Sequence, residues 1–183
     1  MFNFIKTDIE GVYIIEPKIF GDSRGYFMET YKKEEFDKMG FYYEFVQDNQ
    51  SKSKKGVLRG LHFQKQHPQA KLVRVLDGEV FDVAVDLRKG SATYGKYVSA
   101  VLSGDNKKML LIPKGFAHGF LVLSESATFS YKVDDTYRPE DEGGIRWDDP
   151  DINIKWPLEC EPLLSDKDKA LQSFKEIGIE FEL

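Results

Sequence analysis

Three histidines are the only imidazoles in this chain of 183 residues, so each is a candidate for proton transfer or metal binding. His62 lies in GVLRGLHFQ, within a predicted strand, and His118 lies in IPKGFAHGF, between a turn and a strand. His67 precedes Pro68 in a polar stretch typical of a loop. A lone histidine can also be a core or rim residue held by one hydrogen bond, whereas convergence of all three would make a metal site. Spacing alone leaves these interpretations open.

A tyrosine could supply a proton donor. In TFSYKV, alternation places Tyr131 on one face of a predicted strand together with Phe129 and Val133. Most such tyrosines pack with the hydroxyl at a rim. Inside a barrel, however, a phenol with a pKa near 10 holds its proton at neutral pH and can act as a general acid.

Basic residues gather around His62, and they are Lys52, Lys54, Lys55, Arg59, Lys65, Lys71 and Arg74. The run from Lys52 to Lys55 indicates a solvated face, but Arg59 and Lys71 lie in predicted strands beside the histidine. Arginine suits bidentate phosphate binding, and lysine suits a compact developing oxyanion. Strict alternation puts Arg59 on the face opposite His62, so both reach one pocket only if Gly60 permits a bulge. We therefore predict an irregularity at Arg59-Gly60.

Two spacings resemble those of the cupin superfamily. Gly56 is followed by His62 after five residues, and Pro113-x-Gly115-x-x-His118 forms the second motif. Metal-binding cupins carry a His-x-His pair in the first motif, whereas this chain has Gln64 at the second position, and an amide is a poor ligand for a transition metal. The resemblance therefore implies a jelly-roll barrel and argues against its metal.

The elements that position these groups are mainly short strands divided by turns, which is typical of a sandwich or barrel. The predicted strands span 71–76, 80–87, 97–102, 108–112, 119–123 and 128–133. In VFDVAVDL, alternation puts Asp82 on the face of Val80 and Ala84, where an inward carboxylate needs a partner. A short helix is predicted over 32–39, and a second over 166–177 with Ser165 as its N-cap. Residues 137–156 read as a long ordered loop.

Bulk properties narrow the function further. The net charge of −5 provides no field that would draw the chain to nucleic acid or an anionic membrane. Cys160 is the only cysteine, and we find neither a signal-peptide pattern nor an apolar run of membrane-spanning length. We expect one cupin-like domain over residues 1–183 and a cytoplasmic location.

The sequence also resembles the dTDP-4-dehydrorhamnose 3,5-epimerase family, in family order and over nearly the whole chain. The matching stretches are EPKIFGDSRGYFMETY, FVQDNQSKSKKGVLRGLHFQ, KLVRVLDGEVFDVAVDLRKGSATYG, IPKGFAHGFLVLSE, YKVDDTYRPEDEGGIRWDDPDI and LSDKD. One departure is Thr136 before Tyr137, where relatives often have adjacent aromatic residues. The resemblance implies a cofactor-free, metal-free homodimeric cupin. It also implies conversion of dTDP-4-dehydro-6-deoxy-D-glucose to dTDP-4-dehydro-L-rhamnose, for dTDP-L-rhamnose synthesis.

The resemblance further implies residue roles. His62 matches the base, Asp168 the group that orients it, Tyr131 the acid on the opposite face of the sugar, and Lys71 the group facing the keto oxygen. The substrate-contacting positions are matched by Arg24, Glu29, Gln47, Asp48, Asn49, Arg59, His118, Glu142 and Lys167. Carbons 3 and 5 both flank the keto group, so one base and one acid can serve both inversions through an enolate.

Three alternatives follow from the same scaffold. A single-site 3- or 5-epimerase acting on a related dTDP-4-keto-6-deoxy sugar would keep His62 and Tyr131. A non-catalytic sugar-binding cupin would be expected to lack the base or the acid, and both are present. A metal-dependent cupin oxygenase or isomerase is disfavoured by Gln64.

Overall fold

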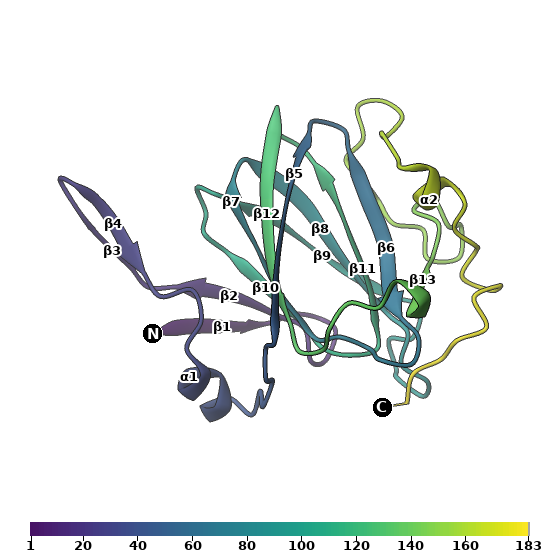
Figure 1. The fold of residues 1–183 in the computed structure, drawn as a ribbon, viewed down its shortest axis with the longest axis horizontal. Coiled ribbons are helices and arrows are strands. Elements are labelled where there is room, and N and C mark those ends of the chain that lie inside the picture. Colours follow the sequence, from purple (N-terminus) through teal and green to yellow (C-terminus); the bar gives the residue numbers. More distant parts are fainter. Residues whose placement is uncertain (183) are drawn as a thin grey trace.

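The computed structural model describes residues 1–182, which form two antiparallel sheets facing each other (Figure 1). The six-stranded sheet has the order β1-β2-β10-β7-β12-β5, and the five-stranded sheet has the order β13-β6-β11-β8-β9. A separate hairpin consists of β3 and β4. This arrangement confirms the predicted, mainly β, cupin-type jelly roll.

The bounds agree with the predicted strands to within a few residues. The strands of the six-stranded sheet are β1 (Phe2–Lys6), β2 (Tyr13–Pro17), β5 (Gln47–Lys54), β7 (Lys71–Asp77), β10 (Met109–Ile112) and β12 (Ser126–Val133). Those of the five-stranded sheet are β6 (Leu58–Gln64), β8 (Glu79–Asp86), β9 (Tyr97–Ser103), β11 (Phe116–Val122) and β13 (Glu142–Gly144). The hairpin is β3 (Ile19–Asp22) and β4 (Gly25–Met28). The helices are α1 (Lys33–Lys38), the 3₁₀ turn η1 (Pro139–Asp141) and α2 (Asp166–Lys169).

Alternation along the strands divides apolar side chains between three clusters. On β8, Val80 and Ala84 pack in the core between the sheets, whereas Val83 and Val85 pack on the outer face beneath the C-terminal segment. The outer face of the six-stranded sheet is covered by Phe36 of α1 and by aromatic residues around it. Both outer faces are thus covered by the chain's own ends, so the two sheets position the groups that lie between them.

The predicted C-terminal helix is wrong beyond its first turn. The Ser165 side chain accepts a hydrogen bond from the Asp168 amide, as the predicted N-cap should, but α2 ends at Lys169. The chain then runs along the five-stranded sheet, where Phe174 and Ile177 pack against its outer face. Tertiary burial of these side chains therefore overrides the local helical pattern.

The predicted irregularity in β6 is confirmed. His62 pairs with His118 and Arg59 pairs with Phe120, so β6 has one more residue than β11 between the two pairs. Gly60 lies at this point with φ +119°, and a Cβ there would come within 2.7 Å of the Gly119 backbone. The extra residue brings Arg59 and His62, three apart in sequence, to the same cavity.

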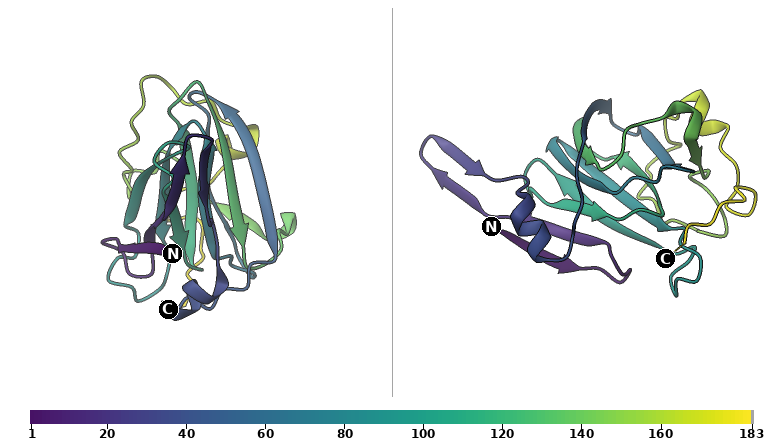
Figure 2. Two further views of the ribbon diagram at one scale, coloured as in Figure 1. Left: turned by 90° about the vertical axis from the view of Figure 1, so that its left-hand side faces the viewer. Right: turned by 60° about the horizontal axis from the view of Figure 1, so that its bottom comes forward.

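The β3–β4 hairpin projects from the sheets as an arm (Figures 1 and 2). Its apolar side chains are exposed, with 48% of Phe20 and 66% of Phe27 accessible to solvent. The predicted 137–156 loop contains η1 and β13, and it is anchored by the buried Ile145 and Ile152. Within residues 1–182, no helix has the length and apolar character needed to cross a bilayer.

Candidate active site

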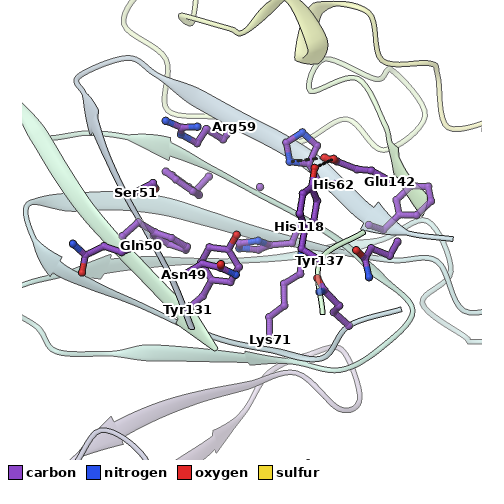
Figure 3. A pocket seen from close by; sticks show the side chains of 16 residues that line it. Asn49, Gln50, Ser51, Arg59, His62, Lys71, His118, Tyr131, Tyr137 and Glu142 are labelled. Atoms are coloured by element: carbon purple, nitrogen blue, oxygen red, sulfur yellow. Dashed lines mark hydrogen bonds and ion pairs between the residues drawn. The ribbon is translucent and has the colours of Figure 1, made fainter. Parts of the chain in front are cut away.

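A cavity of about 200 Å³ opens between the two sheets (Figure 3). Side chains from β5, β7 and β12 line one wall, and side chains from β6 and β11 line the other. The lining residues are Asn49, Gln50, Ser51, Arg59, His62, Phe63, Gln64, Gln69, Lys71, His118, Gly119, Phe120, Phe129, Tyr131, Tyr137 and Glu142. Most of the predicted chemical groups therefore converge on one site.

His62 and Asp168 meet although 106 positions separate them in sequence. Nε2 of His62 lies 2.5 Å from Oδ1 of Asp168, whose Oδ2 accepts a hydrogen bond from Ser165 Oγ at 2.9 Å. Burial opposes ionisation of Asp168, but hydrogen bonds from His62, Ser165 and the Gly60 backbone outweigh it and lower its pKa. An ionised carboxylate in this position holds the proton of His62 on Nε2 and leaves Nδ1 as the free acceptor.

Tyr131 lies on the wall opposite His62, because β12 and β6 belong to different sheets. Its cross-strand neighbour on β5 is Asn49, which also lines the cavity. Burial raises the pKa of Tyr131, as does the nearby charge of Glu142, against weaker opposing effects of Arg59 and Asn49. The phenol therefore keeps its proton at neutral pH and can donate it to a group between the sheets.

Three titratable side chains lie close together here, and two of them, His118 and Lys71, line the cavity. Both carboxylate oxygens of the fully buried Asp82 lie 3.0 Å from Nε2 of His118. Burial raises the pKa of Asp82, against the opposing effects of His118 and Lys71. Burial also lowers the pKa of Lys71 to about 8, although Asp82 and Glu142 favour its charged form. Asp82 is the inward carboxylate that strand alternation predicted, and His118 is its partner.

Glu142 joins β13 to the cavity. One carboxylate oxygen, Oε1, lies 4.0 Å from Nδ1 of His62, and the other accepts hydrogen bonds from the Tyr137 hydroxyl at 2.6 Å and from Lys167. Burial opposes ionisation of Glu142, but Lys167, Tyr137 and His62 together lower its pKa. A carboxylate thus faces the free nitrogen of His62.

The remaining predicted site residues fall into two groups. Arg59 and Asn49 line the cavity, and Gln47, on the same strand as Asn49, donates to Asn49 Oδ1 at 2.8 Å. Three others lie away from the cavity of the same chain. Arg24 in the arm pairs with Asp22, Glu29 pairs with the amino terminus, and Asp48 pairs with Lys132 on the outer face of its sheet. Substrate contact by these three stays a prediction.

The histidines do not gather around one point. His67 lies outside the cavity lining, with Nδ1 3.1 Å from Asp141 Oδ2. Within residues 1–182, no three His, Cys, Asp or Glu side chains are grouped so as to hold a metal ion. Gln64, at the position of the second cupin histidine, points instead to backbone groups of His67, Thr136 and Arg138.

Three residues that line the cavity were not predicted as site residues, and they are Tyr137, Gln64 and Phe129. Strand alternation could have identified Phe129, because it shares a face with Tyr131. Tyr137 lies in a Pro- and Asp-rich loop without a periodic pattern. The available signals were a large aromatic residue in an otherwise polar segment and the adjacent aromatic residues that relatives often have at this position.

The chain is similar to a known family of epimerases in both sequence and structure. A family model described as dTDP-4-dehydrorhamnose 3,5-epimerase matches residues 6–176. The Shigella flexneri protein of that name is 57% identical over 174 residues, covering 94% of this chain and 96% of its own. A crystal structure of dTDP-6-deoxy-D-glucose-3,5-epimerase from Legionella pneumophila, in complex with dTDP-4-keto-L-rhamnose, is 50% identical and covers 100% of both chains with a TM-score of 0.97.

A less similar solved structure is named for an activity at a single carbon. The 3′-monoepimerase of Streptomyces bikiniensis, in complex with dTDP-quinovose, is 34% identical, with a TM-score of 0.86. That match covers 92% of this chain and 86% of the other. The family model and the high identities over almost the full length show that this chain belongs to the dTDP-4-dehydrorhamnose 3,5-epimerase family of isomerases.

Proposed function

We propose that this protein inverts carbons 3 and 5 of dTDP-4-dehydro-6-deoxy-D-glucose to give dTDP-4-dehydro-L-rhamnose. One observation carries the proposal. An imidazole oriented by a carboxylate and a protonated phenol lie on opposite walls of one cavity, which the half-buried Lys71 also lines. Inversion at a carbon next to a ketone needs a base on one face, a proton donor on the other and a stabilised enolate oxygen between them.

In the proposed reaction, Nδ1 of His62 removes the proton from carbon 3 or carbon 5. The electron pair of that C–H bond forms a carbon–carbon double bond to carbon 4, and the keto oxygen becomes an enolate facing the Lys71 ammonium. Asp168 stabilises the imidazolium through Nε2. The hydroxyl of Tyr131 then protonates the same carbon from the other face, and the ketone re-forms with inverted configuration.

The size of the cavity suggests that the sugar of the substrate lies inside it and the nucleotide lies outside. At about 200 Å³ it is smaller than the roughly 300–1,000 Å³ of typical ligand pockets, so it suits one sugar ring better than a whole nucleotide sugar. The nucleotide would lie across the mouth, where Arg59 is exposed and available for the diphosphate. Named ligands of the neighbours support this class, since they are dTDP-4-keto-L-rhamnose and dTDP-quinovose.

We predict that activity falls as the pH rises through about 8, because Lys71 then loses its proton. Above that pH, kcat/KM should fall about tenfold per pH unit, and Lys71→Arg should remove this decline because guanidinium stays charged. Unfolding through Lys71 would not explain the decline. Its folded-state pKa lies below the unfolded value, so this group stabilises the fold increasingly as pH rises from 8 to 10.5. Initial rates of wild type and variant between pH 6.5 and 10 test the assignment, and an unchanged decline in Lys71→Arg would contradict it.

The deciding experiment is proton NMR of chelator-treated protein with dTDP-4-dehydro-6-deoxy-D-glucose in deuterated water. Deuterium at both carbons, with a product that a rhamnose-forming reductase accepts, supports the proposal. Deuterium at one carbon supports the single-site alternative, which the similarity to a 3′-monoepimerase keeps open. Activity that is lost on chelation and restored by a divalent metal would point to the metal-dependent alternative.

We also propose a homodimer in which the arm reaches the other subunit. The support is the exposed Phe20 and Phe27, the position of Arg24 on the arm, and strand β5 at the open edge of its sheet. Sedimentation velocity should give about twice the chain mass of 21.1 kDa, and Phe27→Asp should shift the protein towards monomer. A wild-type monomer at micromolar concentration would contradict this arrangement.

A further inference from the structure

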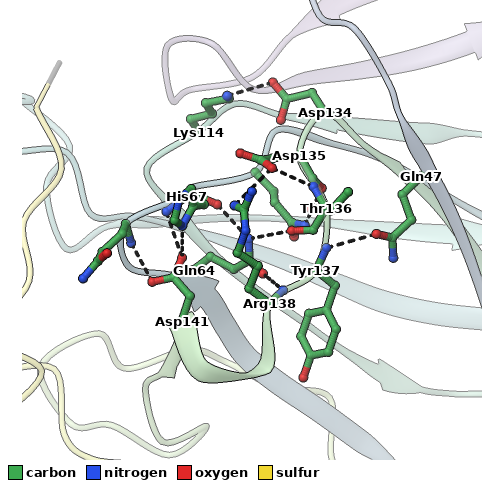
Figure 4. Close-up of polar contacts among 12 residues, drawn as sticks. Gln47, Gln64, His67, Lys114, Asp134, Asp135, Thr136, Tyr137, Arg138 and Asp141 are labelled. Atoms are coloured by element: carbon green, nitrogen blue, oxygen red, sulfur yellow. Dashed lines mark hydrogen bonds and ion pairs between the residues drawn. The ribbon is translucent and has the colours of Figure 1, made fainter.

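Residues 134–138 connect β12 to η1 without regular secondary structure, and their polar contacts are drawn in Figure 4. Backbone hydrogen bonds are found at the two ends of this segment, where the Asp134 amide donates to Ala70 and the Arg138 carbonyl accepts from Asp141. Side chains accept the hydrogen bonds of the Thr136, Tyr137 and Arg138 amides. The segment carries Tyr137, which lines the cavity and donates to Glu142. Whatever fixes this backbone therefore also fixes a wall of the site.

Gln64 supplies a large part of that support. Its Oε1 accepts the Arg138 amide at 2.6 Å, and its Nε2 donates to the carbonyls of Thr136 at 3.2 Å and His67 at 2.8 Å. Only 4% of Gln64 is exposed, so its amide uses both donors and its acceptor oxygen in a buried setting. Loss of the side chain would leave these backbone groups unpaired.

A second glutamine, which belongs to the other sheet, binds the neighbouring backbone amide. Oε1 of Gln47 on β5 accepts the Tyr137 amide at 3.0 Å, while Gln64 on β6 holds the Arg138 amide. The two successive amides are thus bound by side chains of opposite sheets. Tyr137 is fixed relative to both walls of the cavity and not to one strand alone.

We propose that Gln64 is a positioning residue for the epimerisation, acting through the backbone of residues 136–138 on Tyr137 and, through the Tyr137 hydroxyl, on Glu142. This inference rests on the proposed function. Oε1 of Glu142 lies 4.0 Å from Nδ1 of His62, so the contacts lead from a buried amide to the free nitrogen of the proposed base. In metal-binding cupins the residue at this strand position binds the metal, whereas here Gln64 binds the backbone of a loop.

Glutamine fits this task for a simple chemical reason. The side chain must offer two N–H donors to two carbonyls and one oxygen to an amide from the same planar group. Glutamate would keep the acceptor but place an oxygen against the carbonyls of His67 and Thr136. Methionine would match the length of the chain without either function.

A double-mutant cycle tests the proposal. Gln64→Met should lower kcat/KM about tenfold to a hundredfold, because small displacements of catalytic geometry have effects of this size. In a Tyr137→Ala background the same change should lower kcat/KM less than threefold, since its target is gone. The control is Gln66→Met, the same substitution at an exposed side chain two residues away, which should leave kcat/KM unchanged. An equal loss from Gln64→Met in both backgrounds would overturn the proposal.

Amide hydrogen exchange of the wild type, followed by NMR, provides a measurement without turnover or variants. The amides of Tyr137 and Arg138 should exchange as slowly as amides within β12, although they lie in a loop. Fast exchange at both positions would show that Gln47 and Gln64 do not hold these two amides, even if Gln64→Met failed to fold. If the wild type gave no deuterium incorporation into the sugar, the proposed function would fail. The exchange rates of the two amides would still show whether Gln64 holds residues 136–138 in place.

Discussion

Replacing His62 with alanine should stop deuterium incorporation at both carbon 3 and carbon 5 of the sugar. A positioned general base contributes about 10²–10⁴-fold to a rate, and one imidazole is proposed to serve both carbons. Both signals should therefore fall together by at least a hundredfold in the NMR experiment. Binding of dTDP, measured by calorimetry, should be nearly unchanged, because in the proposed arrangement His62 faces the sugar and Arg59 faces the diphosphate.

The matched control is His67→Ala. That histidine lies outside the cavity lining, and its imidazole contacts Asp141. The same deletion there should leave both exchange rates within a few-fold of wild type. Near-normal turnover by His62→Ala would remove His62 from the role of base, and loss at only one carbon would show that a second base serves the other.

Tyr131→Phe should separate proton removal from inversion. The ring and its packing against Phe129 remain, and only the hydroxyl that donates to the far face is lost. His62 can still remove a proton, exchange it with solvent and return deuterium to the same face. Deuterium should therefore enter the unchanged substrate, while formation of inverted product falls about 10²–10⁴-fold.

The control for this variant is Tyr94→Phe, because Tyr94 packs against Phe174 on the outer face of the protein, away from the cavity. NMR coupling constants distinguish the inverted sugar from deuterated starting sugar in one spectrum. Equal loss of exchange and inversion in Tyr131→Phe would mean that the phenol also assists proton removal. Unimpaired inversion would show that another group is the acid.

Strand alternation in the sequence was sufficient to predict much of the β architecture. The buried face of β8, the inward Asp82 and the shared face of Phe129 and Tyr131 follow from a period of two. The irregularity at Gly60 was also predictable, because Arg59 and His62 otherwise point to opposite faces. These features depend on neighbours within a few residues.

Long-range contacts could not be predicted from local pattern. The pairing of His62 with Asp168 joins groups 106 positions apart, and only the family resemblance suggested it. The helix expected over 166–177 stops after one turn because Phe174 and Ile177 pack on a sheet that the local sequence does not reveal. The hydrogen bonds between Gln64 and residues 136–138 likewise depend on the path of the connection after β12, which local sequence does not reveal.

The stacked rings of Phe120 and Phe129 lie between the two walls, with centroids 4.1 Å apart and planes at 15°. Phe120 belongs to β11 and Phe129 to β12, so this pair joins the sheet that carries His62 to the sheet that carries Tyr131. The separation between His62 and Tyr131, the proposed base and acid, therefore depends on how this aromatic pair packs in the core. In the proposed reaction the stereochemical outcome depends in part on this spacing, because a smaller or larger side chain at Phe120 or Phe129 would move the two proposed proton-transfer groups relative to the sugar ring between them.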